Sequence, residues 1–161
     1  MLNERIEKEL NKQLNKELFS AYLYMSMSAY FESKNFLGFA NWMQKQAQEE
    51  LSHAQKVYEF INERNGRVVL ESIEKPQTEW DSFLSAFEDA LKHEQYITAS
   101  INDLVSVANE EKDYATGIFL QWFVTEQVEE EASVDNIINK LRLVKDAPSG
   151  LFMLDKELAQ R

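Results

Sequence analysis

A carboxylate and an imidazole stand three residues apart in the segment Gln46-Ala47-Gln48-Glu49-Glu50-Leu51-Ser52-His53-Ala54. At this spacing Glu50 and His53 lie on one face of a helix, one above the other. That face is otherwise apolar, and it continues through Met43, Ala47, Ala54, Val57 and Ile61. A buried charge costs several kcal/mol unless it is paired or bound to a metal. An inward-facing Glu-x-x-His pair can offer ligands to iron or manganese in a helix bundle, but one such pair also arises by chance.

The composition is typical of one helical domain. The chain has 161 residues, 44% of them hydrophobic and 28% charged, which is enough for a full core and argues against disorder. Only four Gly and two Pro interrupt it, and Glu, Lys, Leu, Ala and Gln are abundant, which favours a few long helices. We therefore expect a single domain over residues 1–161.

The net charge of −11 is unfavourable for nucleic-acid binding and favourable for attracting cations, although acidity alone more often serves solubility. The chain has no Cys, which excludes disulfides and thiolate metal sites. No apolar run approaches the roughly 20 residues of a membrane span. The segment Met1–Lys16 alternates charges and has no apolar signal core. We expect a cytoplasmic protein with no nucleic-acid or membrane partner.

The spacing of apolar residues predicts four long helices and a short fifth. We expect the first over about Glu4–Ser33, the second over about Leu37–Arg64, the third up to about Glu111, the fourth up to about Val144, and the fifth over about Ser149–Ala159. Asn3 is a suitable N-cap for the first helix, and Asn65-Gly66 is typical of the end of the second.

The sequence also contains motifs that indicate where the third and the fifth helices start. Thr78-Glu79-Trp80-Asp81 resembles a capping box with Asp in place of Glu, and Asp146-Ala147-Pro148 resembles a helix start. The intervening segment Arg67–Gln77 is too short for a domain and too long for a tight turn. We interpret it as an extended crossover outside the bundle, which makes the second and third helices parallel.

Acidic side chains interrupt the inward face near the middle of every long helix. They are Glu17 in the first helix, Glu50 with His53 in the second, Glu94 in the third, and Gln127 with Glu130 in the fourth. In a bundle of similar helices these positions share one layer, where four carboxylates repel one another unless two divalent cations balance them. Oxygen-rich ligands with one imidazole suit iron or manganese better than zinc. The alternative, that some of these Glu side chains face solvent or pair with Lys or Arg, is easier to accept for one residue than for the whole set.

With these residues in place, the chain resembles the ferritins, most closely the bacterial non-haem type, over essentially its whole length. The motifs that carry the resemblance are Glu17-x6-Tyr24, Glu49-Glu50-x-x-His53, Glu126-Gln127-x-Glu129-Glu130 and the ending Gly150–Leu158. The ferritin-like di-iron proteins are the known example of such a layer. The resemblance implies an all-α, ferritin-like four-helix bundle with a long crossover between helices two and three and a short fifth C-terminal helix.

Two positions separate this chain from related classes. Its fourth helix has Gln127-x-x-Glu130 where bacterioferritins and di-iron oxygenases have a second Glu-x-x-His pair. Leu51 stands where bacterioferritins carry the Met that ligates haem, so we expect no haem.

The resemblance also implies a role for each residue. Glu17, Glu50 and His53 would hold a first iron ion, and Glu50, Glu94 and Glu130 a second one, with Glu50 bridging. Gln127 would lie close enough to hydrogen-bond an oxygen species. The list of further candidates comprises Glu49, Glu126, Glu129 and Glu130 for a third metal site, and Tyr24 for a hydrogen bond to a ligand or for electron transfer. The alternatives are a solvated acidic face at Glu126–Glu131 and a core Tyr24 with a satisfied hydroxyl.

Other residues of interest receive simpler interpretations. We expect His93 to be a surface residue rather than a ligand, and Met25, Trp42 and Trp80 to serve packing. Trp122 precedes Phe123 and could lie near the site, where the resemblance suggests a redox-active aromatic side chain.

The function implied by the resemblance is iron storage with ferroxidase activity. Fe(II) would react with O2 or peroxide at two iron positions per subunit, with a third position beside them, and the ferric product would enter a mineral inside a homo-oligomeric shell of about 24 subunits. The fifth helix would pack around a symmetry axis. The main alternative is a soluble di-iron oxygenase or peroxidase of the same superfamily, and a DNA-protecting mini-ferritin and a metal-free bundle are more distant ones.

Overall fold

A computed structural model describes residues 2–145 and 147–161. Over these residues the chain forms five helices: α1 (Glu4–Ser33), α2 (Leu37–Glu63), α3 (Phe83–Glu110), α4 (Tyr114–Val144) and α5 (Pro148–Leu158). The helices begin and end within one or two residues of the predicted positions, except at the start of α3. Asp146, which we included in the start signal of α5, lies outside the described residues.

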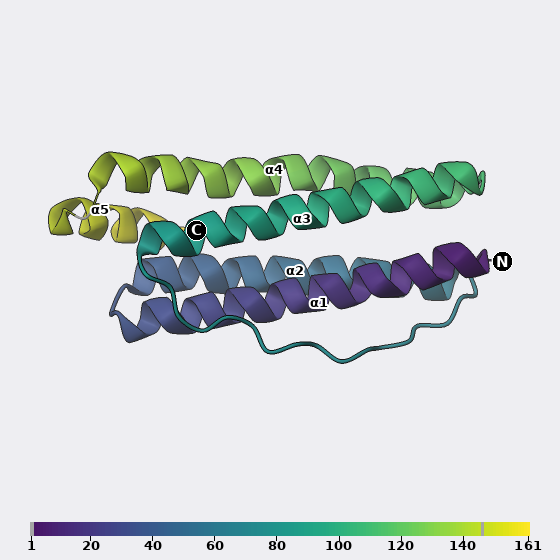
Figure 1. Ribbon diagram of the computed structural model, residues 1–161, viewed down its shortest axis with the longest axis horizontal. Helices are drawn as coiled ribbons and strands as arrows, with labels where there is room; N and C mark the ends of the chain where they lie inside the picture. Colours follow the sequence, from purple (N-terminus) through teal and green to yellow (C-terminus); the bar gives the residue numbers. More distant parts are fainter. Residues whose placement is uncertain (1, 146) are drawn as a thin grey trace.

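The four long helices form a bundle in which α1 packs on α2 and α3 packs on α4 (Figure 1). The segment between α2 and α3 runs along the whole bundle, so that α2 and α3 are parallel, as predicted (Figure 1). Side chains of α1 hold this crossover. Asn11 donates from Nδ2 to the carbonyl of Arg67 at 2.9 Å and accepts from the Val69 amide at 2.7 Å, and Ser26 donates to the carbonyl of Gln77 at 2.6 Å.

The start of α3 differs from the prediction. The capping box is formed by Ser82 and Ser85, each of which accepts the other's backbone N–H, at 3.0 and 2.9 Å, and not by the segment Thr78–Asp81. The reason is Trp80, whose side chain is buried and whose carbonyl accepts a hydrogen bond from the Tyr30 hydroxyl at 3.1 Å. Trp80 reaches the core from extended chain, so the crossover is longer than predicted and the helix begins after it.

The helix ends follow the predicted capping chemistry. Asn65 has a φ of 56° and Gly66 donates its N–H to the carbonyl of Ile61 at 2.9 Å, which together close α2 in the usual C-terminal motif. At the opposite end of α2, Asp155 of α5 accepts from the backbone N–H groups of Gly38 and Phe39 at 2.8 and 3.0 Å. A Cβ at position 38 would lie 1.7 Å from the Asp155 carbonyl oxygen, so glycine is required where α5 crosses α2.

The core consists of two apolar clusters, one toward each end of the bundle. One extends from Leu23 to Phe31 in α1 and from Val134 to Leu141 in α4, and the other from Ile6 to Leu14 in α1 and through Leu120 and Phe123 in α4. Between the two clusters, every long helix contributes buried polar side chains. The four helices therefore bring their mid-helix acidic positions to one level.

Two further features concern the surface. Trp42 and Trp80, which we expected to serve packing, are buried, whereas Met25, for which we expected the same role, is 55% exposed on α1 of the single subunit. The outward direction follows from the helix itself, since Tyr24 and Met27 already occupy the inward face around it. Among the described residues, no helix combines the length and apolarity that a membrane crossing needs.

Candidate metal centre

The polar layer consists of side chains that are almost fully buried. The exposed fraction is 0% for Glu17, 2% for Glu50 and His53, 1% for Glu94, 3% for Gln127 and 4% for Glu130. All four long helices contribute, and the residues come from the positions where the sequence breaks the apolar face of each helix. The predicted convergence of these six residues is what the fold produces.

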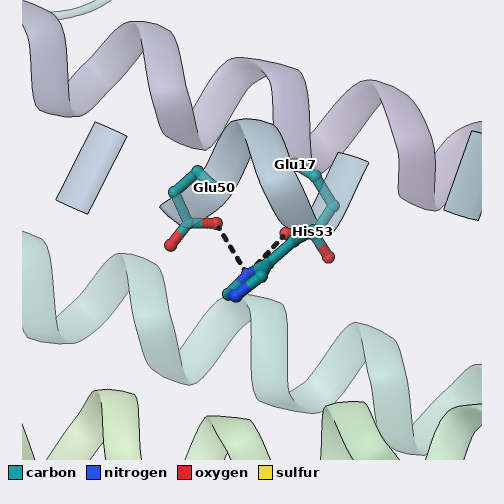
Figure 2. Close-up of side chains that lie close together, drawn as sticks. All are labelled: Glu17, Glu50 and His53. Atoms are coloured by element: carbon teal, nitrogen blue, oxygen red, sulfur yellow. Dashed lines mark ion pairs between the residues drawn. The ribbon is translucent and has the colours of Figure 1, made fainter. Parts of the chain in front are cut away.

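One group of potential ligands comprises Glu17, Glu50 and His53, whose ligand atoms lie within 4.8 Å of one another. The Nδ1 atom of His53 is 3.4 Å from Oε2 of Glu50 and 3.9 Å from Oε2 of Glu17 (Figure 2). Among the residues described, neither His53 Nδ1 nor Glu17 Oε2 has a hydrogen-bond partner, although both atoms are buried. Two unpartnered buried ligand atoms that face one another fit a metal ion better than a protein hydrogen bond.

A second group comprises Glu50, Glu94 and Glu130, again within 4.8 Å. Glu50 is common to both groups, which fits the bridging role that we expect for it. Neighbouring side chains hold the outer oxygens of this group. The Tyr24 hydroxyl donates to Oε1 of Glu94, and Gln127 donates from Nε2 to Oε2 of Glu94 at 3.2 Å. Both predictions for Tyr24 are compatible with this bond, because its hydroxyl is satisfied and the acceptor is a candidate ligand.

Two buried glutamines complete the layer, and neither was among the site residues predicted from the sequence. Gln46 donates from Nε2 to Oε2 of Glu130 and, at 3.4 Å, to Oε1 of Glu50. Gln13 donates from Nε2 to Oε1 of Glu17 at 2.6 Å. Each glutamine stands four residues before a candidate ligand on its own helix, and this i, i+4 spacing of an amide and a carboxylate was the available signal.

Burial dominates the electrostatics of the layer. It raises the pKa of Glu17 to about 8, with repulsion from Glu50 as the next cause, and the pKa of Glu130 to about 7, with repulsion from Glu94. The pKa of Glu94 rises to about 6, because hydrogen bonds from Tyr24 and Gln127 oppose the effect of burial. The pKa of Glu50 lies well above its usual value owing to burial and the charges of Glu94 and Glu130. Without metal, the layer therefore retains protons near neutral pH.

The donor set fits iron. Four carboxylates and one imidazole supply hard oxygen ligands, and two divalent cations would replace the retained protons as the source of positive charge. These atoms are contributed by four different helices and are held by the side chains of Gln13, Tyr24 and Gln46. The arrangement therefore offers two groups of potential metal ligands that share Glu50.

The ferritin-like domain family matches residues 7–144 of the chain. The chain belongs to this family. The bacterial non-heme ferritin of Staphylococcus saprophyticus is 42% identical over 161 residues, which are 100% of this chain and 96% of that relative, and the one of Bacteroides fragilis is 42% identical over 100% of both chains. Among solved structures, an open pore ferritin from the hyperthermophilic archaeon Archaeoglobus fulgidus has a TM-score of 0.99 and 52% identity, covering 100% of this chain and 99% of the other. The predicted family and the predicted bundle are confirmed.

The residues that we assigned to a third metal site are not all brought together in this ferritin-like domain. Glu126 and Glu130 form a group with His53, whose Nε2 atom is 3.9 Å from Oε1 of Glu126. Glu49 and Glu129 are exposed, and within the described chain neither belongs to a group of potential ligands. Glu49 instead accepts a hydrogen bond from Nη2 of Arg161 at 2.6 Å. The third site stays a prediction.

Two ring side chains differ in their relation to the layer. Trp122 is 39% exposed and its ring centroid lies 5.3 Å from that of His53, so it is near the site, as the resemblance suggested. His93 is partly buried and not a surface residue, because its Nε2 atom lies 2.7 Å from the Ser20 hydroxyl and its ring packs on Phe19. Burial lowers the pKa of His93 to about 4. Among the described residues, His93 belongs to no group of potential metal ligands.

Proposed function

We propose that this ferritin stores iron, and that it oxidises Fe(II) with O2 at a dinuclear centre inside each subunit. The observation that carries the proposal is the position of Glu50, which is shared by two groups of buried ligand atoms in one layer of the bundle. The family membership and the relatives named as bacterial non-heme ferritins support the storage function. We treat residues 1–161 as one ferritin-like domain.

Iron is the substrate of this centre. One Fe(II) ion is held by Glu17, Glu50 and His53, and the other by Glu50, Glu94 and Glu130. Each Fe(II) loses one electron, and O2 accepts both electrons and two protons to reach the level of peroxide. Carboxylate oxygens are hard ligands that stabilise Fe(III) relative to Fe(II), which favours the oxidation.

The surrounding side chains have supporting roles in this proposal. Tyr24 and Gln127 keep Glu94 oriented through the hydrogen bonds described above. Position 127 carries an amide, which donates to Glu94, where di-iron oxygenases have an imidazole, and this difference disfavours the oxygenase alternative. Trp122, whose ring centroid lies 5.3 Å from that of His53, donates an electron in this proposal, as the family resemblance suggests.

Storage requires an assembly, because one helical bundle has no interior space for a mineral. A hollow homo-oligomeric shell, of about 24 subunits, meets this need. Large apolar side chains on α4 and α5 support an interface at this end of the bundle, since Leu143, Phe152 and Met153 are 83%, 61% and 76% exposed. The cytoplasmic location expected from the sequence stays a prediction.

Anaerobic titration of the metal-free protein with Fe(II) tests the proposal. We expect saturable binding of two Fe(II) per subunit in the dinuclear layer, rapid oxidation when O2 is admitted, and elution in size-exclusion chromatography as a large hollow assembly. The control variant is Asp135→Asn, which changes an exposed carboxylate on the same helix as Glu130. Its Fe(II) binding should equal that of the wild type. A wild-type protein that binds no Fe(II) with saturation would overturn the proposal.

A further inference from the structure

A chain of three hydrogen bonds reaches Glu17 from outside the ligand groups. Lys16 donates from Nζ to the Ser100 hydroxyl oxygen at 2.6 Å, Ser100 donates to Oε1 of Gln13 at 2.6 Å, and Gln13 donates from Nε2 to Oε1 of Glu17 at 2.6 Å. Gln13 is 1% exposed, whereas Lys16 and Ser100 are partly buried. The chain thus connects a partly solvated ammonium group on α1 to the buried layer through α3.

The direction of each bond follows from the chemistry of the groups. An ammonium group can only donate, so the Ser100 oxygen accepts from Lys16 and keeps its single proton for another acceptor. The nearest acceptor is the carbonyl oxygen of Gln13, which leaves the NH2 group of Gln13 facing Glu17. In the flipped amide, the Ser100 proton would point at an NH2 group, which cannot accept it, so the chain fixes one orientation.

The two carboxylate oxygens of Glu17 have different surroundings. Oε1 is engaged by Gln13, whereas Oε2, which has no partner among the described residues, faces His53 Nδ1 at 3.9 Å. Gln46 stands in the equivalent position before Glu50, but its own Oε1 is buried without a partner in the part of the chain described. The amide of Gln13 is therefore oriented by the hydrogen bond that its oxygen accepts from Ser100. The oxygen of Gln46 accepts no such bond from the described residues.

We propose that Gln13 is a positioning residue, oriented by Ser100 and Lys16, which presents Glu17 to the first metal ion through Oε2 alone. The proposal rests on the proposed function, since it concerns metal binding to the same layer. Gln13 does not touch the metal. It keeps the carboxylate from rotating or from binding with both oxygens, and in this way it sets the affinity of the first position relative to the second.

Titration with Co(II), a divalent ion that can occupy the ligand groups without the oxidation that Fe(II) undergoes, tests the proposal without relying on activity. Hydrogen bonds to charged groups are strong enough that Gln13→Met is expected to weaken the Glu17-containing position by about tenfold, with little change at the second. Ser100→Ala is expected to weaken the same position by a smaller factor. Ser100→Thr, which keeps the hydroxyl, is expected to restore wild-type affinity, and a merely structural role of Ser100 would not produce this selective loss and rescue.

The matched control is Ser106→Ala on the same helix, because the Ser106 hydroxyl donates to the Asn102 carbonyl, one turn earlier, at 3.0 Å. If each position binds Co(II) with the same affinity in the wild type, in Ser100→Ala and in Gln13→Met, the role of Gln13 is wrong. The proposed function would still stand. Absence of Co(II) binding to the wild type would instead contradict the dinuclear centre itself. If Gln13→Met fails to assemble, Ser100→Ala, the milder change, decides the question.

Discussion

Oε2 of Glu50 lies 3.4 Å from Nδ1 of His53, one turn along α2, and both side chains are almost completely buried. The same carboxylate also faces Glu94 and Glu130 from the neighbouring α3 and α4. Glu50 therefore joins a nitrogen-containing group of ligands to an all-carboxylate group. The two halves of the centre depend on one side chain, and the predictions below follow from this dependence and from the burial of the layer.

Glu130→Ala is expected to abolish the fast phase of Fe(II) oxidation and to leave the oligomer assembled. The variant removes one ligand of the second group, and it also removes a buried carboxylate that repels Glu94 when no metal is present. Stopped-flow oxidation and size-exclusion chromatography measure the two effects. An unchanged initial rate would count against the assignment of Glu130.

The stability of the metal-free protein is expected to fall as the pH rises from about 4.5 to about 8. The folded pKa of Glu17, about 8, lies above its usual value of 4.5, so the folded state holds a proton that the unfolded state releases over this range. Each retained proton changes the free energy of unfolding by about 1.4 kcal/mol per pH unit. Chemical unfolding at several pH values measures the slope, and Glu17→Gln should reduce it. A stability that rises through the same range would be inconsistent with the raised pKa values.

Metal binding is expected to release protons at pH 7. The carboxylates of Glu17 and Glu130, with pKa values of about 8 and 7, are partly protonated there without metal, and coordination requires the ionised form. Anaerobic calorimetric titration with Fe(II) in two buffers of different ionisation enthalpy gives the number of protons released. A result of zero would show that the layer is already ionised.

Tyr24→Phe is expected to weaken metal binding in the second group by about 10-fold, because outer hydrogen bonds to ligands commonly contribute this much. Tyr24 donates to Oε1 of Glu94 and lowers the pKa of that carboxyl, so its loss favours the protonated form. Tyr30→Phe is the matched control, since the Tyr30 hydroxyl bonds to the Trp80 carbonyl away from the layer. Equal Co(II) affinities in both variants would refute the role given to Tyr24.

Arg161→Ala is expected to increase binding of a third metal ion by a few-fold. The guanidinium group donates to Glu49 at 2.6 Å, and the partial exposure of this pair limits its contribution. Anaerobic Fe(II) titration beyond two ions per subunit measures the effect. Arg142→Ala, which breaks the comparable pair with Glu88 on another surface, serves as the control. Weaker third-site binding in Arg161→Ala than in that control would contradict competition at Glu49.

The acidic layer was predictable from the sequence because the inward face of each helix follows from the spacing of apolar residues within that helix. Glu17, Glu50, Glu94 and Glu130 each interrupt an apolar face, and helices of similar length bring such mid-helix positions to one level. The crossover was predictable for a similar reason, since Arg67–Gln77 offers neither a helical pattern nor a short turn. These features depend on spacing within single helices and on the length of a connection.

The remaining features depend on contacts between distant parts of the chain. The Trp80 side chain is buried, the Tyr30 hydroxyl donates to the Trp80 carbonyl, and α3 begins only after this residue, at Phe83. The pairing of Glu49 with Arg161 joins residues 112 positions apart, so no local pattern predicts it. Gln13 was missed because a neutral amide in an apolar face gives no charge signal, and its orientation depends on Ser100 from another helix.

The most direct test of the central claim is a crystal structure of the assembled protein after anaerobic soaking in Fe(II), with anomalous diffraction recorded at the iron absorption edge. We predict two iron peaks in each subunit, both inside the bundle and both in contact with Glu50, one beside Glu17 and His53 and the other beside Glu94 and Glu130. Iron found only on the surface, or a single ion that Glu50 does not touch, would contradict the account.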